Sequence, residues 1–426
     1  SGMGCAISPG IDHDRMRERH PSQFSTAGRM KLSIRIFAVF GAITVSSWTA
    51  SAQTAPAPVP LDTGYVNYDD GPISLPLGVG LRIPSYDRVD GLALPFGPMI
   101  TLSGGQFELD PTVTYRSHLG KFDPWGKATI KLGTHDALLI NGGRATFSND
   151  EWLRSSIVNS LASFGVGSDA RNYFRADRVT AEIKHDIVGN GTTITPRIGA
   201  LHENAWSTGT PVPHTSAPWS IFGRTGSRKM RRINPSIVRG HTTSGTAGLN
   251  YGYDLNQMTV AVDAGIEHAF DAPRTSTNSS GDFTQITLDG KAKFLTFGTQ
   301  YFTFSSHVLV TPGDGAPAQR YSYLGGAGTL ATVDLLAIGG DRLAYVEGEY
   351  SVPLPKPLLP FVGAPLVSLR YAAGSAGVGS LPDFIQNIGV GLGVKFIRAE
   401  YHVDPNFKKT PYTHKSALSV GLSLSM

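Results

Sequence analysis

The sequence carries few of the residue patterns that support catalysis. It contains no G-x-S-x-G nucleophile motif, and its single cysteine, Cys5, lies near the start of the chain. The histidines fall singly, without H-E-x-x-H or another paired spacing suited to a metal ion. We therefore expect no catalytic residue, no metal site and no cofactor. Serine and histidine side chains that meet only in space leave a hydrolase as an alternative.

Ionizable residues instead alternate with apolar ones. The stretch 343–355, LAYVEGEYSVPLP, places Glu347 and Glu349 on one face of an extended strand and residues such as Val346 and Tyr350 on the other. Such a strand suits a wall with one wet and one apolar side. The residues expected on the wet, lumen-facing side, where mixed charges favour structural ion pairs, are Glu347, Glu349, Arg370, Arg398 and Glu400.

Composition and periodicity predict an all-β fold. Fifty glycines, 28 prolines and only 16% charged residues indicate many turns and few long helices. About fifteen alternating segments run from residue 88 to residue 426, and most are long enough for a tilted strand to cross a bilayer. Residues 72–83 supply one more candidate. We predict a transmembrane antiparallel β-barrel of sixteen strands, with twelve to fourteen strands or a soluble exported β-protein as alternatives.

The connections between these segments support a barrel. Short and long links alternate, which is typical of a barrel with tight turns at one end and long loops at the other. The short links are 189–191 and those near Asn256 and Lys395, and the long ones are 206–243, 271–282, 312–341 and 405–415.

One segment breaks the β pattern. In residues 150–176, Asp150 is a plausible helix N-cap, and Trp152, Ile157 and Leu161 follow at helical spacing before Gly165. We expect a short helical insertion near 150–175.

The N-terminal part predicts export. Met30 precedes a basic KLSIR, an apolar run and a small-residue site that ends at Ala52. We expect a signal peptide at 30–52, cleaved after Ala52, with a transmembrane anchor as the alternative. Residues 1–29 then lie upstream of the mature protein, 53–71 form an extended lead-in and 72–426 form the barrel. The expected location is the bacterial outer membrane.

The charge pattern does not favour a nucleic-acid partner. The net charge is only +4, and residues 224–241 hold the one basic cluster of the predicted mature chain. For an exported protein we expect outer-membrane lipids and lipopolysaccharide phosphates as partners, with a solvated loop as the alternative.

Several stretches resemble a known family. GGDRLAYVEGEYSVPLP (339–355) and FIRAEYHVDP (396–405) resemble the C-terminal barrel of the bacterial surface antigen superfamily, which contains outer-membrane assembly factors and two-partner secretion transporters. PSYDRVDGLAL (84–94) is similar to the opening strand of related barrels, and YLGGAGTLAT (323–332) to the family's lid-loop pattern. The resemblance implies a pore or an assembly or translocation barrel, and it marks the lid-loop candidates Gly325, Gly326, Gly339, Gly340 and Asp341.

Two departures qualify this resemblance. The arginine of the lid-loop pattern falls on Ala331, so we expect the loop to lack a guanidinium that pairs with a lumen carboxylate; Glu400 matches the acidic position. The family's assembly members carry POTRA domains before the barrel, and we expect none here. We predict a non-enzymatic pore or assembly-type barrel, with an unidentified client or periplasmic partner. A barrel-embedded lipid hydrolase and a purely structural outer-membrane protein are the alternatives.

Overall fold

The fold is seen in a computed structural model that describes residues 71–208, 219–222, 232–255, 257–276, 278–355, 364–394 and 397–422. All of these belong to one compact unit, Pro56–Met426. The predicted upstream segment 1–29, the signal peptide 30–52 and all but the last residue of the lead-in 53–71 lie outside the described residues, so these boundaries stay predictions.

The core of the fold is one antiparallel sheet of nineteen strand segments. In chain order the segments are β1 (Ile73–Ser74), β2 (Ser85–Asp87), β3 (Gly91–Phe96), β4 (Met99–Leu102), β5 (Phe107–Arg116), β6 (Lys121–Lys131), β7 (Asp136–Phe147), β8 (Phe174–His185), β9 (Ile187–Gly189), β10 (Thr192–Ser207), β11 (Gly240–Leu255), β12 (Met258–Asp271), β13 (Phe283–Leu295), β14 (Tyr301–Val310), β17 (Arg342–Pro353), β18 (Leu366–Gly377), β19 (Ile385–Val394), β20 (Ile397–Val403) and β21 (Ser416–Leu422).

The remaining elements are short and lie between these strands. They are the helix α1 (Ser156–Val166), the separate pair β15 (Ser322–Leu324) and β16 (Ile338–Gly340), and the 3-10 turns η2 (Pro76–Gly78), η3 (Ser103–Gly105) and η5 (Ala318–Arg320).

The nineteen segments occupy sixteen positions, because three strands are each broken into two pieces. β1 and β2 follow each other along β4 and β3, and β8 and β9 follow each other along β10. β3 and β4 pair with β5 in a single register, which sets Pro98 opposite Pro111. Neither proline has an N–H for the ladder, so the strand is interrupted there. The predicted all-β antiparallel fold with sixteen strands is confirmed.

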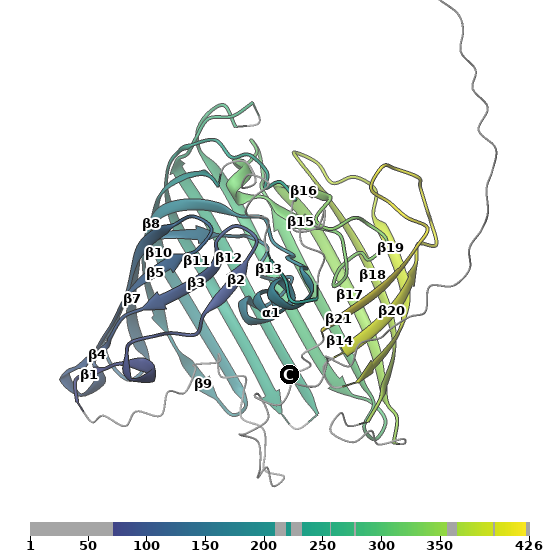
Figure 1. The fold of residues 1–426 in the computed structure, drawn as a ribbon, viewed down its shortest axis with the longest axis horizontal. Helices are drawn as coiled ribbons and strands as arrows, with labels where there is room; N and C mark the ends of the chain where they lie inside the picture. Colours follow the sequence, from purple (N-terminus) through teal and green to yellow (C-terminus); the bar gives the residue numbers. More distant parts are fainter. Residues whose placement is uncertain are drawn as a thin grey trace, which may run out of the picture. The chain divides into compact units, whose positions relative to one another are not determined.

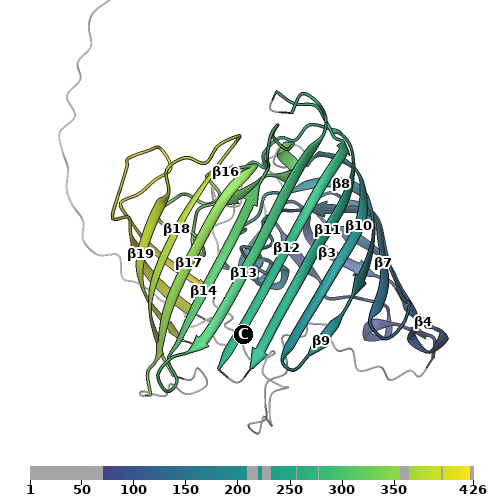
Figure 2. The same ribbon diagram turned by 180° about the vertical axis from the view of Figure 1, so that it is seen from behind.

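The two faces of the sheet differ in polarity. On β18, Val367, Leu369 and Tyr371 are exposed, whereas Ser368 and Arg370 on the opposite face are buried. Figure 1 shows the strands curving around α1, and Figure 2 shows β11 to β14 and β17 to β19 side by side on the far side. The buried polar face is therefore the inner one.

The sheet has two edges in the part that the structure describes. β1 and β2 form the first and β21 the last, and no ladder among the described residues joins them. Closure of the predicted barrel by strand pairing thus stays a prediction.

The predicted helical insertion is confirmed, but its N-cap is not the expected one. Ser155 caps α1 by accepting a hydrogen bond from the Val158 N–H, and Gly167 ends it in the left-handed conformation. Asp150 lies five residues earlier and accepts other backbone bonds. In the described parts of the chain, no helix combines the length and apolar character needed to cross a bilayer.

Candidate functional site

Two inserted segments lie against the inner face and contact each other. We call residues 148–173, which include α1, the helical insertion, and residues 311–341, which include η5, β15 and β16, the lid segment. The Trp152 indole N–H donates to Ser322 Oγ at 2.9 Å, and the Tyr323 N–H donates to Asp150 Oδ1 at 3.2 Å. The two segments are therefore docked to each other as well as to the sheet.

Arg320 of the lid segment inserts between two carboxylates of the wall. Its Nη1 lies 2.8 Å from Glu203 on β10, and its Nε and Nη2 lie 2.9 and 3.0 Å from the two oxygens of Glu267 on β12. Glu203 is fully buried and also accepts from Arg178 Nε at 2.8 Å. Buried charges are tolerated only when they are paired in this way.

This arrangement corrects one sequence-based expectation. The lid segment was expected to lack a guanidinium for a lumen carboxylate because the motif position holds Ala331. Arg320, eleven residues earlier, supplies one, and it reaches β10 and β12 instead of Glu400 on β20. Glu400 pairs with two arginines of the wall itself.

His307 of β14 connects the wall to both inserted segments. Its Nδ1 lies 2.6 Å from Asp289 of β13, its Nε2 lies 3.3 Å from Ser322 Oγ, and its ring stacks on Trp152 with centroids 4.1 Å apart. Ser322 and His307 are both buried. In the sequence this histidine stands alone, because its partners come from three other parts of the chain.

The second half of the lid segment is fixed by polar bonds to β18 and β19. Arg370 donates to the Thr329 carbonyl at 3.1 Å, and the Thr332 N–H donates to Asn387 Oδ1 at 3.0 Å. Asn387 Nδ2 in turn donates to Thr332 Oγ1 at 2.7 Å. The stretch from Gly325 to Gly340, which belongs to the long link 312–341 named above, packs against the inner face of the wall.

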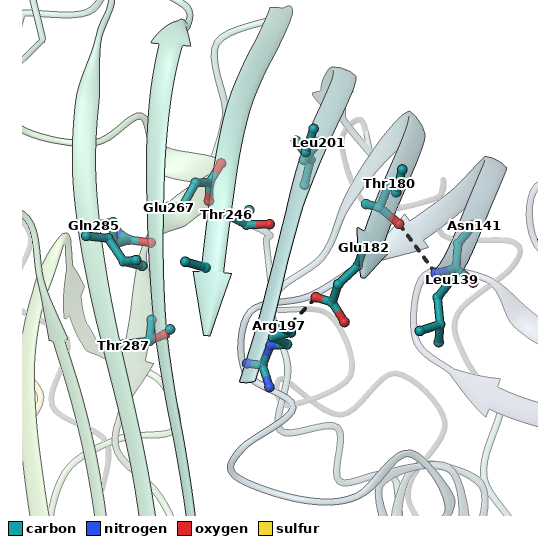
Figure 3. A pocket seen from close by; sticks show the side chains of 15 residues that line it. Leu139, Asn141, Thr180, Glu182, Arg197, Leu201, Thr246, Glu267, Gln285 and Thr287 are labelled. Atoms are coloured by element: carbon teal, nitrogen blue, oxygen red, sulfur yellow. Dashed lines mark hydrogen bonds and ion pairs between the residues drawn. The ribbon is translucent and has the colours of Figure 1, made fainter. Parts of the chain in front are cut away.

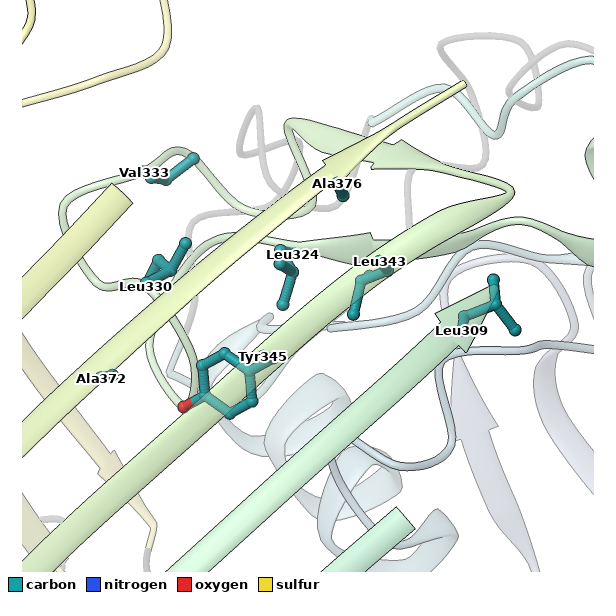
Figure 4. Packing of buried hydrophobic residues seen from close by; sticks show 8 residues of the cluster. All are labelled: Leu309, Leu324, Leu330, Val333, Leu343, Tyr345, Ala372 and Ala376. Carbon is teal, nitrogen blue, oxygen red and sulfur yellow. The ribbon is translucent and has the colours of Figure 1, made fainter. Parts of the chain in front are cut away.

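An apolar cluster supports the same contact (Figure 4). It joins residues of the lid segment to residues of β14, β17 and β18, namely Leu309, Leu324, Leu330, Val333, Leu343, Tyr345, Ala372 and Ala376. Most of these side chains are more than 95% buried. Burial of apolar area therefore adds to the polar bonds that hold the lid segment in place.

The glycines proposed for the lid loop occupy tight positions. Gly325 has a φ of 121°, and a Cβ there would lie 2.1 Å from the Asp334 carbonyl oxygen. A Cβ on Gly340 would lie 2.0 Å from the Gly377 carbonyl oxygen. Asp341 is buried and accepts from the Gly379 N–H at 2.8 Å. Gly326 and Gly339 lie in the same segment, beside Leu335 and Tyr323.

The five residues expected on the lumen-facing side form one ion-pair network. Arg370 lies 2.6 Å from Glu347 and 3.5 Å from Glu400. Arg398 donates two hydrogen bonds to Glu349, at 2.7 and 3.0 Å, and lies 2.6 Å from Glu400. Because each charge has a partner of opposite sign, the network is built for structure more than for chemistry. Their role in a lumen stays a prediction.

A polar cavity of about 330 Å³ lies on the inner face, against strands β7, β8 and β10 to β13 (Figure 3). Glu182 and Arg197 line it and lie 3.7 Å apart. Glu267 and Gln285 also line it, and Gln285 Nε2 donates to the Arg320 carbonyl at 3.2 Å. The cavity therefore borders the place where Arg320 is fastened. The lid segment does not fill this space beside the wall.

Burial raises the pKa of Asp150 to about 7, although nearby backbone N–H groups and the Arg232 charge oppose the shift. Its oxygens accept from the Asn172 N–H at 2.8 Å and the Tyr323 N–H at 3.2 Å. Asp150 thus links the helical insertion to the lid segment through a carboxyl that titrates near neutral pH.

Among the described residues, no group of three or more His, Cys, Asp or Glu side chains could hold a metal ion.

A solved structure of another protein has a similar fold. No protein-family model matches the sequence, and no curated protein matches it. The structure of BamA from Haemophilus ducreyi lacking POTRA domains 1-3 is similar, with a TM-score of 0.50 and 11% identity over 80% of this chain and 69% of that chain. At this identity the match shows a similarity of fold, which agrees with the β-barrel fold predicted from the sequence.

Two further structures are more distant. CdiB from Escherichia coli has a TM-score of 0.46 and 12% identity, and CdiB from Acinetobacter baumannii has a TM-score of 0.44 and 13% identity. The matches cover 83% and 80% of this chain. The chain spans 62% and 58% of the two CdiB chains, less than two thirds of each.

Proposed function

We propose that this chain is an integral outer-membrane barrel of the translocation or assembly type, whose interior is closed by the lid segment and the helical insertion. Its apolar outer face suits a bilayer, and its inner face carries paired charges. Sixteen-stranded barrels leave an aqueous channel unless inserted segments fill them. Passage then requires the lid segment to leave the wall.

The buried contact of Arg320 with Glu203 and Glu267 carries this proposal. It places a cation of the lid segment inside the wall, where all three of its charged nitrogens have carboxylate partners. Breaking such a contact takes the arginine partner from Glu267 and leaves the buried Glu203 with Arg178 alone. The lid segment is therefore held in a closed position, and the polar cavity beside Glu267 marks where a conduit would begin.

Conductance across planar bilayers tests the proposal. The wild-type barrel should be silent, and Arg320→Ala should show frequent openings. Arg144→Ala is the matched control, because Arg144 pairs with Asp177 at 2.6 Å while both side chains are about half exposed. A wild-type barrel that conducts steadily would contradict the closed state, and a folded but silent Arg320→Ala would show that Arg320 does not hold it.

A hydrolase is the second candidate, because Asp289, His307 and Ser322 lie in the order of a catalytic triad. The surroundings do not favour catalysis. Ser322 is 2% exposed, its oxygen already accepts from Trp152, and the cavity described above is not lined by any of the three residues. A substrate carbonyl has no place to approach. We propose that this group fastens the lid segment and that the protein is not an enzyme.

Outer-membrane lipids are the proposed partners of the apolar outer face. Lipopolysaccharide is proposed for the basic cluster 224–241, of which residues 224–231 lie outside the described residues. The negative phosphates of lipopolysaccharide would complement the positive arginines of that cluster.

A further inference from the structure

Helix α1 buries polar side chains and exposes large apolar ones, the reverse of the usual arrangement. It buries Asn159 and Ser163 together with the small Ala162. It exposes Ile157, Leu161 and Phe164, which follow at the i, i+4, i+7 spacing of one helical face. These apolar side chains are 41%, 45% and 37% exposed. A helix packed in a protein normally buries its apolar side. An exposed apolar face therefore needs another environment.

The buried side of α1 is fixed by polar contacts. The Asn159 Nδ2 donates to Asp169 Oδ1 and to the Tyr173 hydroxyl, both at 3.1 Å, and its Oδ1 accepts from the Ala170 N–H at 2.9 Å. All three partners follow α1 in the chain. Because these contacts are buried, they set which face of the helix points inward.

The helix lies between the two edges of the sheet. On the first edge, the Tyr86 N–H of β2 donates to Ser160 Oγ at 2.7 Å, and the Tyr86 ring lies against Phe164 with centroids 5.5 Å apart. On the other edge α1 contacts β21. Figure 1 shows α1 in the opening between these strands. In the described residues, α1 is thus what separates strands that no ladder joins.

The exposed apolar face of α1 continues into its neighbours. Residues 219–222 bond to its C-terminal turn, with the Ile221 and Phe222 N–H groups donating to the carbonyls of Phe164 and Gly165. Trp219 lies against Phe164 at 5.5 Å, and Trp219 and Phe222 are largely exposed. On β21, Leu418 and Val420 are also largely exposed. Apolar surface therefore runs from the outer wall across the helix.

The chemistry of α1 suits hydrocarbon. Its sequence, SIVNSLASFGV, contains no charged residue. A charge at the bilayer centre is costly, and backbone groups that face lipid must be bonded within their own segment. A helix meets the second condition by itself, whereas two unpaired strand edges do not. At the seam, α1 also satisfies one group of the first edge, because the Tyr86 N–H donates to Ser160 Oγ.

We propose that α1 closes the seam of the barrel between β2 and β21 and presents Ile157, Leu161 and Phe164 to the acyl chains of the membrane. This inference rests on the proposed membrane location of the barrel. The partner is lipid hydrocarbon, and the helix acts as a piece of the outer wall as well as part of the interior filling.

Spin-label accessibility in phosphatidylcholine vesicles tests this. In a Cys5→Ser background, a nitroxide is attached to Leu161→Cys, to Leu369→Cys on the outer face of β18 and to Ser380→Cys in an exposed loop. Collisions with oxygen report lipid, and collisions with a water-soluble nickel chelate report solvent. Since Leu161 and Leu369 are both exposed, labels there should leave packing unchanged.

The label at 161 should match the label at 369, with an oxygen-to-nickel accessibility ratio severalfold above that at 380. A ratio at 161 equal to that at 380 would overturn the inference, because the helix would then face water. Shielding of 161 from both reagents would also overturn it, by showing that a second protein or a second copy covers the face. If 369 itself resembles 380, the proposed membrane location fails and the inference fails with it.

Discussion

Trp152 of the helical insertion lies flat on His307 of the wall, with ring centroids 4.1 Å apart and planes 10° from parallel. The same indole donates to Ser322 of the lid segment. One side chain therefore joins the helical insertion to the wall and to the lid segment, which lie more than 150 residues farther along the chain. The proposed closed state depends on contacts of this kind, which join a wall strand to two inserted segments.

Substitution of Trp152 should release the helical insertion. Trp152→Ala removes both the stacking and the hydrogen bond; because the indole is partly buried, the loss should stay below the about 3–5 kcal/mol of a fully buried tryptophan. Trp152→Phe keeps a ring on His307 and loses only the N–H, so about 1 kcal/mol is expected. Protease cleavage within 148–173 measures the release. Equal cleavage of the Phe and Ala variants would mean that the stacked ring contributes nothing.

The wall network should be sensitive to Arg398. Arg398→Ala leaves Glu349 and Glu400 without their shared cation, and we expect a loss of about 3–5 kcal/mol in the free energy of unfolding. Lys131→Ala is the control, because the pair of Lys131 with Glu108 is half exposed and should contribute at most about 1 kcal/mol. Urea midpoints of the two variants in detergent compare them, and indistinguishable midpoints would contradict the prediction.

The docking of the two inserted segments should weaken as the pH rises. Burial raises the pKa of Asp150 from 3.8 to about 7, so the docked state holds a proton that the undocked state releases. The stabilisation is complete below about pH 4 and is lost as the pH rises through 7; at about 1.4 kcal/mol per pKa unit it amounts to at most about 4 kcal/mol.

Hydrogen exchange of the Asn172 and Tyr323 amides, which donate to Asp150, measures this effect. After correction for intrinsic exchange, protection should be greater at pH 5 than at pH 8 in the wild type. Asp150→Asn should remove the difference, since the amide does not titrate. Persistence of the full pH dependence in Asp150→Asn would assign it to another group.

Ser322 should be inert toward reagents for serine hydrolases. Its side chain is buried under Trp152 and His307, so a fluorophosphonate probe has no path to the oxygen. We expect no labelling of the folded wild-type barrel in lipid vesicles and no difference between wild type and Ser322→Ala. Labelling that disappears in Ser322→Ala would revive the hydrolase alternative.

The wall could be predicted from the sequence because its signal is local. The alternation of polar and apolar residues in 343–355 and in neighbouring segments predicted the strands. It also placed five charged residues on one face, and the structure brings their side chains together, namely Glu347, Glu349, Arg370, Arg398 and Glu400. The broken strands were harder, since Pro98 interrupts a ladder only because Pro111 lies opposite it.

The filling of the interior could not be predicted, because its contacts are non-local. Arg320 meets Glu203 across 117 residues, and no spacing in the sequence links them. Asp150 precedes an apolar helical pattern and therefore resembled an N-cap, although Ser155 has that role. The reversed polarity of α1 was readable in its sequence only once the position of Asn159 inside the fold was known.

The central claim is that the lid segment closes a conduit and must move to open it. Thr332 of the lid segment and Asn387 of β19 are in side-chain contact, and a disulfide between Thr332→Cys and Asn387→Cys, verified by thiol titration, serves as a reversible lock in a Cys5→Ser, Arg320→Ala background. Single-channel conductance is recorded before and after reduction of the disulfide. The account predicts silence when the lock is oxidised and openings after reduction; identical conductance in both states would contradict it.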